Sequence, residues 1–201
     1  MTLRRRSFEL ALAVLSTAGL LLSACGTTES PATAPAADVE QVDVTAYVVA
    51  YHWGFALFDE DGGELGQLRV PVGAGVELVA VNDQASEAIA QLPDAVAEAI
   101  RTDDWHERVY DDVEAGRIPD PQSRMGMTPS ETLDVAFRQY GGDHSLMVTG
   151  VGAEVFLDAE AHEPERLVFT VDREGAFEFR CNVECGFGHD YQRWELLLVE
   201  A

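Results

Sequence analysis

Short runs of alternating apolar and polar residues, separated by glycine-rich turns, dominate this chain and limit the folds open to it. The first run covers 42–50 and continues through 51–58 to a turn signal at 61–63. Further runs lie at 68–72, 76–81, 145–149, 154–157, 167–171, 176–180 and 194–199. Such alternation is typical of strands with one buried face. The pattern predicts an all-β sandwich or Greek-key barrel.

The segment from about 83 to 140 departs from this pattern and has helical periodicity. One apolar face lies within 85–92 and ends at Pro93, and a second follows within 95–100. The sequence TPSE at 128–131 is typical of a capping box with proline at the first helical position. We therefore expect a helical insertion at about 83–140 inside the β domain.

The N-terminus has the features of a processing signal. Three arginines at 4–6 precede an apolar stretch at 10–22, which is too short to span a bilayer unaided. The following residues, Leu-Ser-Ala-Cys25, resemble the bacterial lipobox, in which cleavage leaves the cysteine as a lipidated N-terminus. The alternative is an ordinary signal peptide with an unused cysteine. Acyl chains on Cys25 would hold the chain on a membrane surface without a spanning helix.

These features predict three parts in the chain. Residues 1–24 are expected to be a lipoprotein signal peptide. Residues 25–40, rich in Thr, Pro and Ala, are expected to be a flexible tether. The remainder, 41–201, is the expected folded domain. Such a leader places the domain on the extracytoplasmic face of a bacterial membrane, as periplasmic or cell-surface protein.

Charge restricts the partners. The formal net charge is -23, and because the first 24 residues carry +2, the remainder carries -25. A surface this acidic repels nucleic acid and anionic lipid and attracts basic proteins. General solubility, or life at high salt, is the alternative explanation.

The strongest chemical motif lies near the C-terminus. Its sequence is Cys181-Asn-Val-Glu-Cys185-Gly-Phe-Gly-His189-Asp-Tyr-Gln192, on a loop between two predicted strands. Thiolates and an imidazole at this spacing form a compact donor set that suits copper or zinc. Two cysteines in an oxidising compartment also form disulfides by default. From the residues alone, copper, structural zinc and a disulfide all remain open.

The motif resembles the copper loop of the Cu-A family, the cupredoxin-like domain of cytochrome c oxidase subunit II. That loop has the pattern Cys-x-x-x-Cys-x-x-x-His-x-x-Met and closes a cupredoxin barrel. Further resemblances occur in the family's order along the chain: YHWGF at 51–55 to its Trp-rich strand, LRVPVG at 68–73, Asp143-His144-Ser145-Leu146 to the run carrying its upstream histidine, and the approach at 175–181.

The resemblance implies a fold and a set of ligands. The domain would be a cupredoxin-like sandwich with two copper ions, bridged by Cys181 and Cys185. His144 and His189 would each bind one copper. Two weaker axial donors would be the Val183 carbonyl and the Gln192 side chain.

Several residues depart from the family pattern. Gln192 stands at the methionine position, and Val183 stands where the oxidases have glutamate. The family's two N-terminal transmembrane helices are replaced by the expected lipid anchor, and the helical insertion is unusual. Gln192 is expected to be a weak axial donor. The alternative is that it faces solvent while the axial place is empty or filled by something else, such as Met147.

The other aromatic and histidine residues offer fewer ligands. The resemblance makes Trp53 a candidate for the residue through which electrons enter, with core packing as the equal alternative. His52, next to it, is expected on the opposite strand face and is not counted as a ligand. His106 and His162 are expected on the surface.

The resemblance implies a respiratory electron-transfer function. Electrons would come from a cytochrome c-like donor and pass to oxidase subunit I, with no substrate-turnover site in this chain itself. One alternative is a lipoprotein of the cell envelope that binds a single copper for delivery or storage. The other is a structural lipoprotein with a Cys181–Cys185 disulfide. A nitrous oxide reductase is excluded because its second cluster needs many histidines and this chain has five.

Overall fold

The structure is a computed structural model that describes residues 41–105, 107–108, 142–183, 185, 189 and 192–201. In chain order the elements are β1 (Val44–Tyr51), β2 (Gly54–Phe58), β3 (Glu64–Leu65), β4 (Leu68–Pro71), β5 (Gly75–Asn82), α1 (Ser86–Ile89), α2 (Asp94–Thr102), β6 (His144–Val148), β7 (Ala153–Leu157), β8 (Glu165–Thr170), β9 (Gly175–Arg180) and β10 (Arg193–Glu200). The predicted signal peptide, tether and capping box at 128–131 lie outside the described residues.

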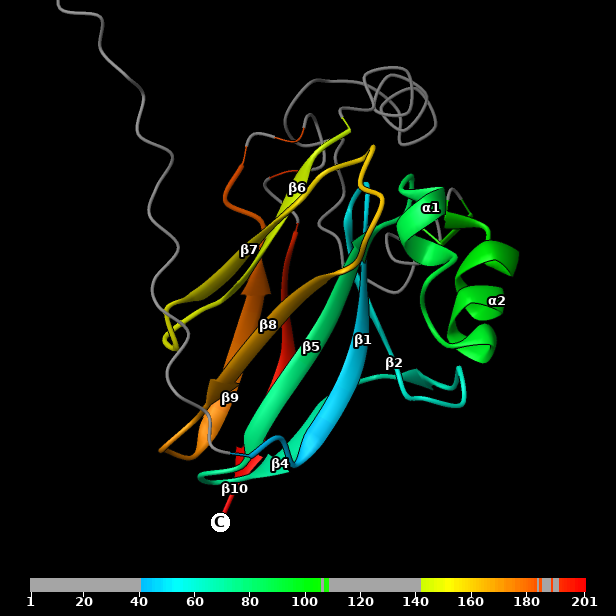
Figure 1. Ribbon diagram of the computed structural model, residues 1–201. Coiled ribbons are helices and arrows are strands. Elements are labelled where there is room, and N and C mark those ends of the chain that lie inside the picture. The colour runs from blue at the N-terminus through cyan, green and yellow to red at the C-terminus, as the bar shows by residue number, and fades with distance from the viewer. Residues whose placement is uncertain (1–40, 106, 109–141, 184, 186–188, 190–191) are drawn as a thin grey trace, which may run out of the picture. The chain divides into compact units, whose positions relative to one another are not determined.

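The strands form two five-stranded sheets, seen as two layers in Figure 1. One sheet has the order β3-β2-β1-β5-β8 and the other the order β4-β10-β9-β6-β7. The pairs β1–β5 and β4–β10 are parallel and the other pairs are antiparallel. The chain changes sheets between β3 and β4, and at each later step except from β6 to β7 and from β9 to β10. This Greek-key connectivity confirms the predicted cupredoxin-like, all-β sandwich.

The space between the sheets holds the main hydrophobic core. Strands β1 and β5 contribute alternate residues to it, including Ala46, Val48 and Leu78, all fully buried. The opposite sheet contributes Phe179 and Leu197, which are also fully buried. Burying a side chain of this size stabilises the fold by about 1.5–3 kcal/mol relative to exposure. The core therefore gives the site at its end a rigid support.

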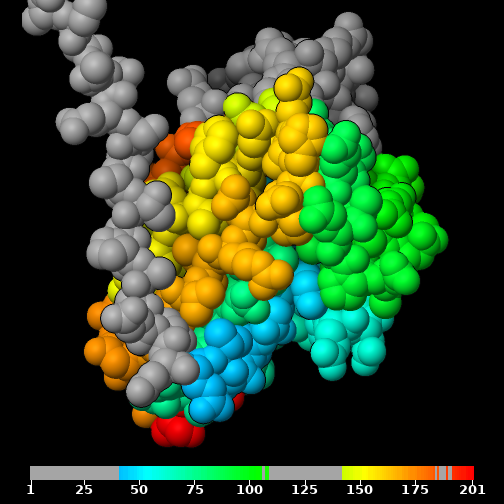
Figure 2. Space-filling model, in the orientation of Figure 1, coloured from blue at the N-terminus to red at the C-terminus, as the bar shows by residue number. Residues whose placement is uncertain are grey.

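The two helices cover the outer face of the first sheet (Figure 1). Their buried residues, among them Val96 and Ile100, form a second apolar cluster with Val49 and Val81 of the sheet. This second cover explains why β1 and β5 are apolar on both faces rather than alternating strictly. Figure 2 shows the helices, in green, covering one side of the strands in this view. The helical prediction is confirmed for α1 and α2, on either side of Pro93.

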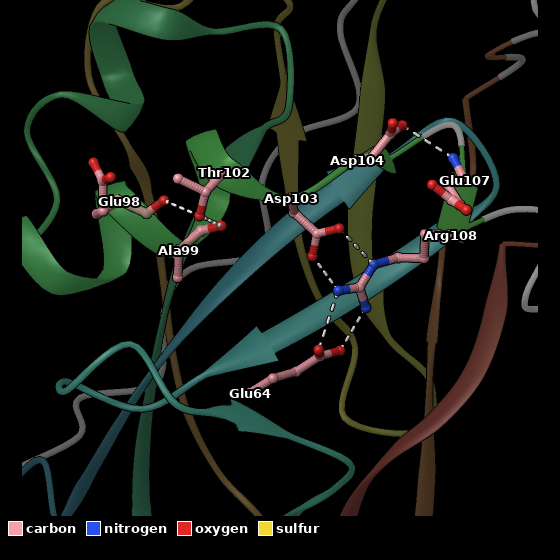
Figure 3. A network of polar contacts seen from close by, with 8 residues as sticks. All are labelled: Glu64, Glu98, Ala99, Thr102, Asp103, Asp104, Glu107 and Arg108. Atoms are coloured by element: carbon pink, nitrogen blue, oxygen red, sulfur yellow. Dashed lines mark hydrogen bonds and ion pairs between the residues drawn. The ribbon is translucent and has the colours of Figure 1, made fainter.

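An arginine joins the end of the helical segment to the first sheet. The Arg108 guanidinium donates to Glu64 Oε1 at 2.5 Å and Oε2 at 3.1 Å, and it also pairs with Asp103 (Figure 3). Glu64 belongs to β3. By pairing with both carboxylates, Arg108 attaches the chain that follows α2 to strand β3.

One predicted boundary is wrong. The run at 51–58 was expected to continue the first strand, but the chain turns at His52 and Trp53, and β1 and β2 form a hairpin in which Tyr51 faces Gly54. A side chain at Gly54 would collide, because its Cβ would lie 2.8 Å from Tyr51 Oη and 3.0 Å from the Trp194 ring. The predicted turn at 61–63 is confirmed, with Gly62 at a φ of 78°.

Candidate metal centre

The sheet itself brings the predicted ligands together. His144 is the first residue of β6, and Cys181 follows directly after β9. These two strands pair antiparallel, with Met147 opposite Arg180. Beyond this pair, Ser145 Oγ accepts a hydrogen bond of 2.8 Å from the main-chain N–H of Asn182. The start of β6 is therefore fixed beside the cysteine loop.

Three buried donors meet at this point. The ligand atoms of His144, Cys181 and Cys185 all lie within 4.8 Å of one another. Their residues are 1%, 1% and 2% exposed, so bulk water has no access to them. Both cysteines are free, with their sulfur atoms 3.5 Å apart. This arrangement has the thiol pair of a metal centre and lacks the disulfide that was one of the alternatives.

The two thiols share their protons unequally. The hydrogen bond with Cys185, assisted by those from His144 and the Ser145 N–H, lowers the pKa of Cys181 despite the opposing effect of burial. The same hydrogen bond, together with burial, raises the pKa of the Cys185 thiol. Of the two thiols, Cys181 therefore loses its proton the more readily. A thiolate is the form that binds a soft metal.

Two further predicted ligands lie beside the thiols. His189 is partly exposed, with its Nδ1 3.7 Å from Cys185 Sγ. The carbonyl oxygen of Val183 lies 3.3 Å from Cys181 Sγ. The structure thus brings an imidazole to one cysteine and a carbonyl to the other, while metal ligation by either remains a prediction.

Gln192 is fully buried and reaches into the centre. Its Oε1 lies 2.9 Å from Cys185 Sγ, and its Nε2 lies 3.1 Å from His144 Nδ1. Nε2 also donates to the main-chain carbonyl of Tyr51 at 2.6 Å. The alternative that Gln192 faces solvent is therefore wrong.

Met147 does not take the axial place expected for Gln192. Its sulfur accepts a hydrogen bond of 3.0 Å from Asn182 Nδ2, and it lies three residues along β6 from His144. Alternate residues of a strand face opposite sides, so Met147 points away from the face that carries His144. Met147 is excluded from the axial place in this arrangement.

The donor set fits a copper ion on an observation independent of any resemblance. His144 is buried, and its Nε2 has no hydrogen-bond partner within the described part of the chain. A buried imidazole nitrogen without a partner is costly, and a metal ligand bond is one way to satisfy it. Two soft thiols and an imidazole in a water-excluding pocket suit copper, and they also suit zinc.

The remaining candidates lie elsewhere. Trp53 is fully buried in the cluster under the helices, and its ring meets His52 edge-on at 5.8 Å. Its role in electron transfer remains a prediction. His162 is on the surface as predicted, 78% exposed and 2.5 Å from Glu87. Cys25 and His106 lie outside the described residues.

Comparison with known proteins finds similarity to solved structures at low sequence identity. No protein family and no curated protein matches the sequence. The periplasmic domain of subunit II of cytochrome oxidase (CoxB) of Bradyrhizobium japonicum is similar with a TM-score of 0.44 and 11% identity, over 80% of this chain and 86% of that one. A heme-copper terminal oxidase dimer gives 0.41 and 12%, over 78% of this chain and 63% of that one.

A third solved structure has a similar score. It is the mixed disulfide intermediate between thioredoxin-like TlpAs and subunit II of cytochrome c oxidase, with a TM-score of 0.42 and 11% identity over 81% of this chain and 85% of that one. None of these similarities assigns a site or an activity to the present chain.

Two contributors to the centre were not found from the sequence. The first is the Tyr51 carbonyl, a main-chain atom that carries no sequence signal. The second is Ser145, whose N–H lies 3.4 Å from Cys181 Sγ and whose hydroxyl holds Asn182. The position of Ser145 directly after a predicted ligand was the only available signal for it.

Proposed function

We propose that this chain is a copper-binding electron-transfer protein that resembles subunit II of cytochrome c oxidase. The observation that carries the proposal is the buried cluster of two free thiols and an imidazole, with all donor atoms within 4.8 Å. His144, Cys181, Cys185 and His189 would hold two copper ions, with the cysteines as bridges. The Val183 carbonyl and Gln192 would be weak axial donors.

The surrounding chain favours electron transfer over turnover of a substrate. When bound, the copper ions would supply a site that gains and loses single electrons. The residues limit how far the site rearranges, because His144 is held in β6 and Cys181 is held by the Ser145 N–H. The burial of both thiols excludes water and exchangeable ligands. A site with little reorganisation and no access for water suits electron transfer.

The wider setting is part of the same proposal. Lipidation of Cys25 would hold the domain at the extracytoplasmic face of the cell membrane. A cytochrome c-like protein would deliver electrons, with Trp53 as the receiving residue, and oxidase subunit I would accept them. No helix within the described ranges is long and apolar enough to cross a membrane.

One observation favours a second candidate, a lipoprotein that binds one copper for delivery or storage. The compact cluster comprises three donors, those of His144, Cys181 and Cys185, and His189 stands outside it. Three donors suffice for a single ion. The two candidates therefore differ in copper stoichiometry.

The deciding experiment is reconstitution of the purified chain with copper. Two ions per chain and a purple mixed-valence spectrum are expected for the proposed function. One ion per chain without that spectrum would replace it with the second candidate. Failure to bind copper at all would overturn both.

A further inference from the structure

The carboxamide of Gln192 has only one orientation that its surroundings allow. A main-chain carbonyl can accept a hydrogen bond but never donate one. The Tyr51 carbonyl, 2.6 Å away, must therefore face Nε2 and not Oε1 of Gln192. This contact fixes the orientation of the carboxamide.

The orientation of the Gln192 amide determines which ring nitrogen of His144 carries the proton. Nε2 of Gln192 is a donor only, and it lies 3.1 Å from His144 Nδ1. Nδ1 must therefore accept the hydrogen bond with its lone pair. In a neutral imidazole the proton then sits on the other ring nitrogen, Nε2 of His144.

The same orientation sets the state of Cys185. Oε1 of Gln192 is an acceptor, and it lies 2.9 Å from Cys185 Sγ. Two lone pairs at that distance would repel, so the thiol proton of Cys185 lies toward Oε1, and the contact of Cys185 with the Cys181 sulfur at 3.5 Å is the longer of the two. One buried side chain thus engages an imidazole of β6 and a thiol of the loop before β10, and is itself attached to the end of β1.

We propose that Gln192 is a positioning residue of the metal-free centre. Until a metal binds, it keeps Nδ1 of His144 and Sγ of Cys185 in hydrogen bonds and so holds both side chains in place. This role rests on the proposed function for the identity of the site, but it concerns the chain without metal. Binding of a metal at Cys185 Sγ must release the hydrogen bond to Oε1 of Gln192, and binding at the unpartnered Nε2 of His144 would displace the proton held there. The glutamine then changes partners while staying attached to the Tyr51 carbonyl.

The contrast with Asn182 gives a matched control. Asn182 is an amide on the same loop, but it is exposed and its Nδ2 contacts Met147 and Glu154 instead of a proposed ligand. An Asn182→Ala variant loses an amide near the site without touching the contacts of Gln192. Gln192→Leu removes all three of those contacts, and Gln192→Met removes them with an unbranched side chain of similar length.

The first measurement uses nitrogen NMR of the histidine rings in the metal-free protein. The wild type and Asn182→Ala are expected to show His144 in the single tautomer with its proton on Nε2. Gln192→Leu or Gln192→Met should show a mixture of tautomers. A proton on Nδ1 of His144 in the wild type would overturn the proposal without any variant being needed.

The second measurement is the rate at which an alkylating reagent modifies Cys185 in the metal-free protein, followed by mass spectrometry. Loss of one hydrogen bond of about 1 kcal/mol should raise the rate about fivefold in both Gln192 variants. Asn182→Ala should react at the wild-type rate. Equal rates in all four proteins would overturn the proposal. Because no copper is used, failure of the chain to bind copper would leave this result unaffected.

Discussion

Asn82 donates a hydrogen bond of 3.2 Å to the carbonyl of Leu157, and so connects the end of β5 in one sheet to the end of β7 in the other. Leu157 is the partner of His144 in the β6–β7 ladder. The buried Asn82 also donates to the Gly142 carbonyl at 2.5 Å and accepts from the Gln84 N–H at 3.0 Å. A single amide therefore fixes the strand that begins with a proposed ligand.

Replacing Asn82 by alanine should destabilise the domain. The change removes three hydrogen bonds and leaves the Leu157 carbonyl buried without its side-chain donor, which costs about 2 kcal/mol or more. Denaturant unfolding of the metal-free protein measures this free energy. Gln67→Ala is the matched control, because the exposed Gln67 amide also donates to a carbonyl, that of Glu195. Its effect should stay within about 0.5 kcal/mol. Equal losses in the two variants would contradict the role given to Asn82.

Cys185→Ser should abolish a two-copper centre. The serine oxygen is a harder donor than sulfur and a poor bridge, although Cys181, 3.5 Å away, would remain. Copper analysis and the visible spectrum of the reconstituted protein measure the loss. Asn182→Ala should keep both coppers and the spectrum. A serine variant with two coppers and the wild-type spectrum would refute the bridging role.

The sequence predicted the strands and the cysteine pair because both depend on side-chain types at fixed spacing. Alternation located each strand of the second sheet to within a few residues. The spacing of Cys181 and Cys185 carried one part of the ligand prediction, whereas His144 came from the resemblance of residues 143–146 to the family's upstream histidine run. Pairing of β6 with β9 then placed His144 beside the loop, which sequence alone did not establish.

The hairpin at His52 and Trp53 was missed for a physical reason. Two-residue hairpin turns usually need positive φ and are marked by Gly, Asn or Asp. The turn residues His52 and Trp53 are none of these three types, and no described residue other than glycine has a positive φ. Both side chains are buried, so they look like strand residues in a hydropathy pattern. The need for glycine at position 54 comes from its close packing against Tyr51 and Trp194, and this packing is visible only in the folded structure.

Cys25→Ala should move the protein from the membrane to the soluble fraction. The expectation rests on the lipobox-like sequence at 22–25, because acyl chains on this cysteine would be the attachment. Cell fractionation followed by immunoblotting measures the distribution. Cys185→Ser is a suitable control, since it removes a different cysteine and should leave the protein on the membrane. Membrane association that is unchanged in the Cys25 variant would refute lipid anchoring.

Electron transfer from a basic cytochrome c should slow as ionic strength rises. The chain after its leader carries -25, and this charge steers a cationic partner. Screening shortens the reach of that field from about 30 Å at 0.01 M to about 10 Å at 0.1 M. The association rate should fall about tenfold or more across that range in stopped-flow measurements. An uncharged reductant should show no such dependence, and equal rates with the cytochrome at both salt concentrations would exclude electrostatic docking.

Gln192→Met should raise the reduction potential of the copper-loaded protein while both coppers stay bound. The axial donor tunes such a site, and an amide oxygen favours Cu(II) whereas the softer thioether favours Cu(I). The oxygen is the expected donor atom, because the Tyr51 carbonyl faces Nε2 of Gln192 and Oε1 faces Cys185 at 2.9 Å. Redox titration of the wild type beside the variant measures the shift. Asn182→Ala, which alters an amide facing away from the centre, should leave the potential unchanged. A potential that stays the same or falls in the methionine variant would show that Gln192 gives no axial oxygen to the metal.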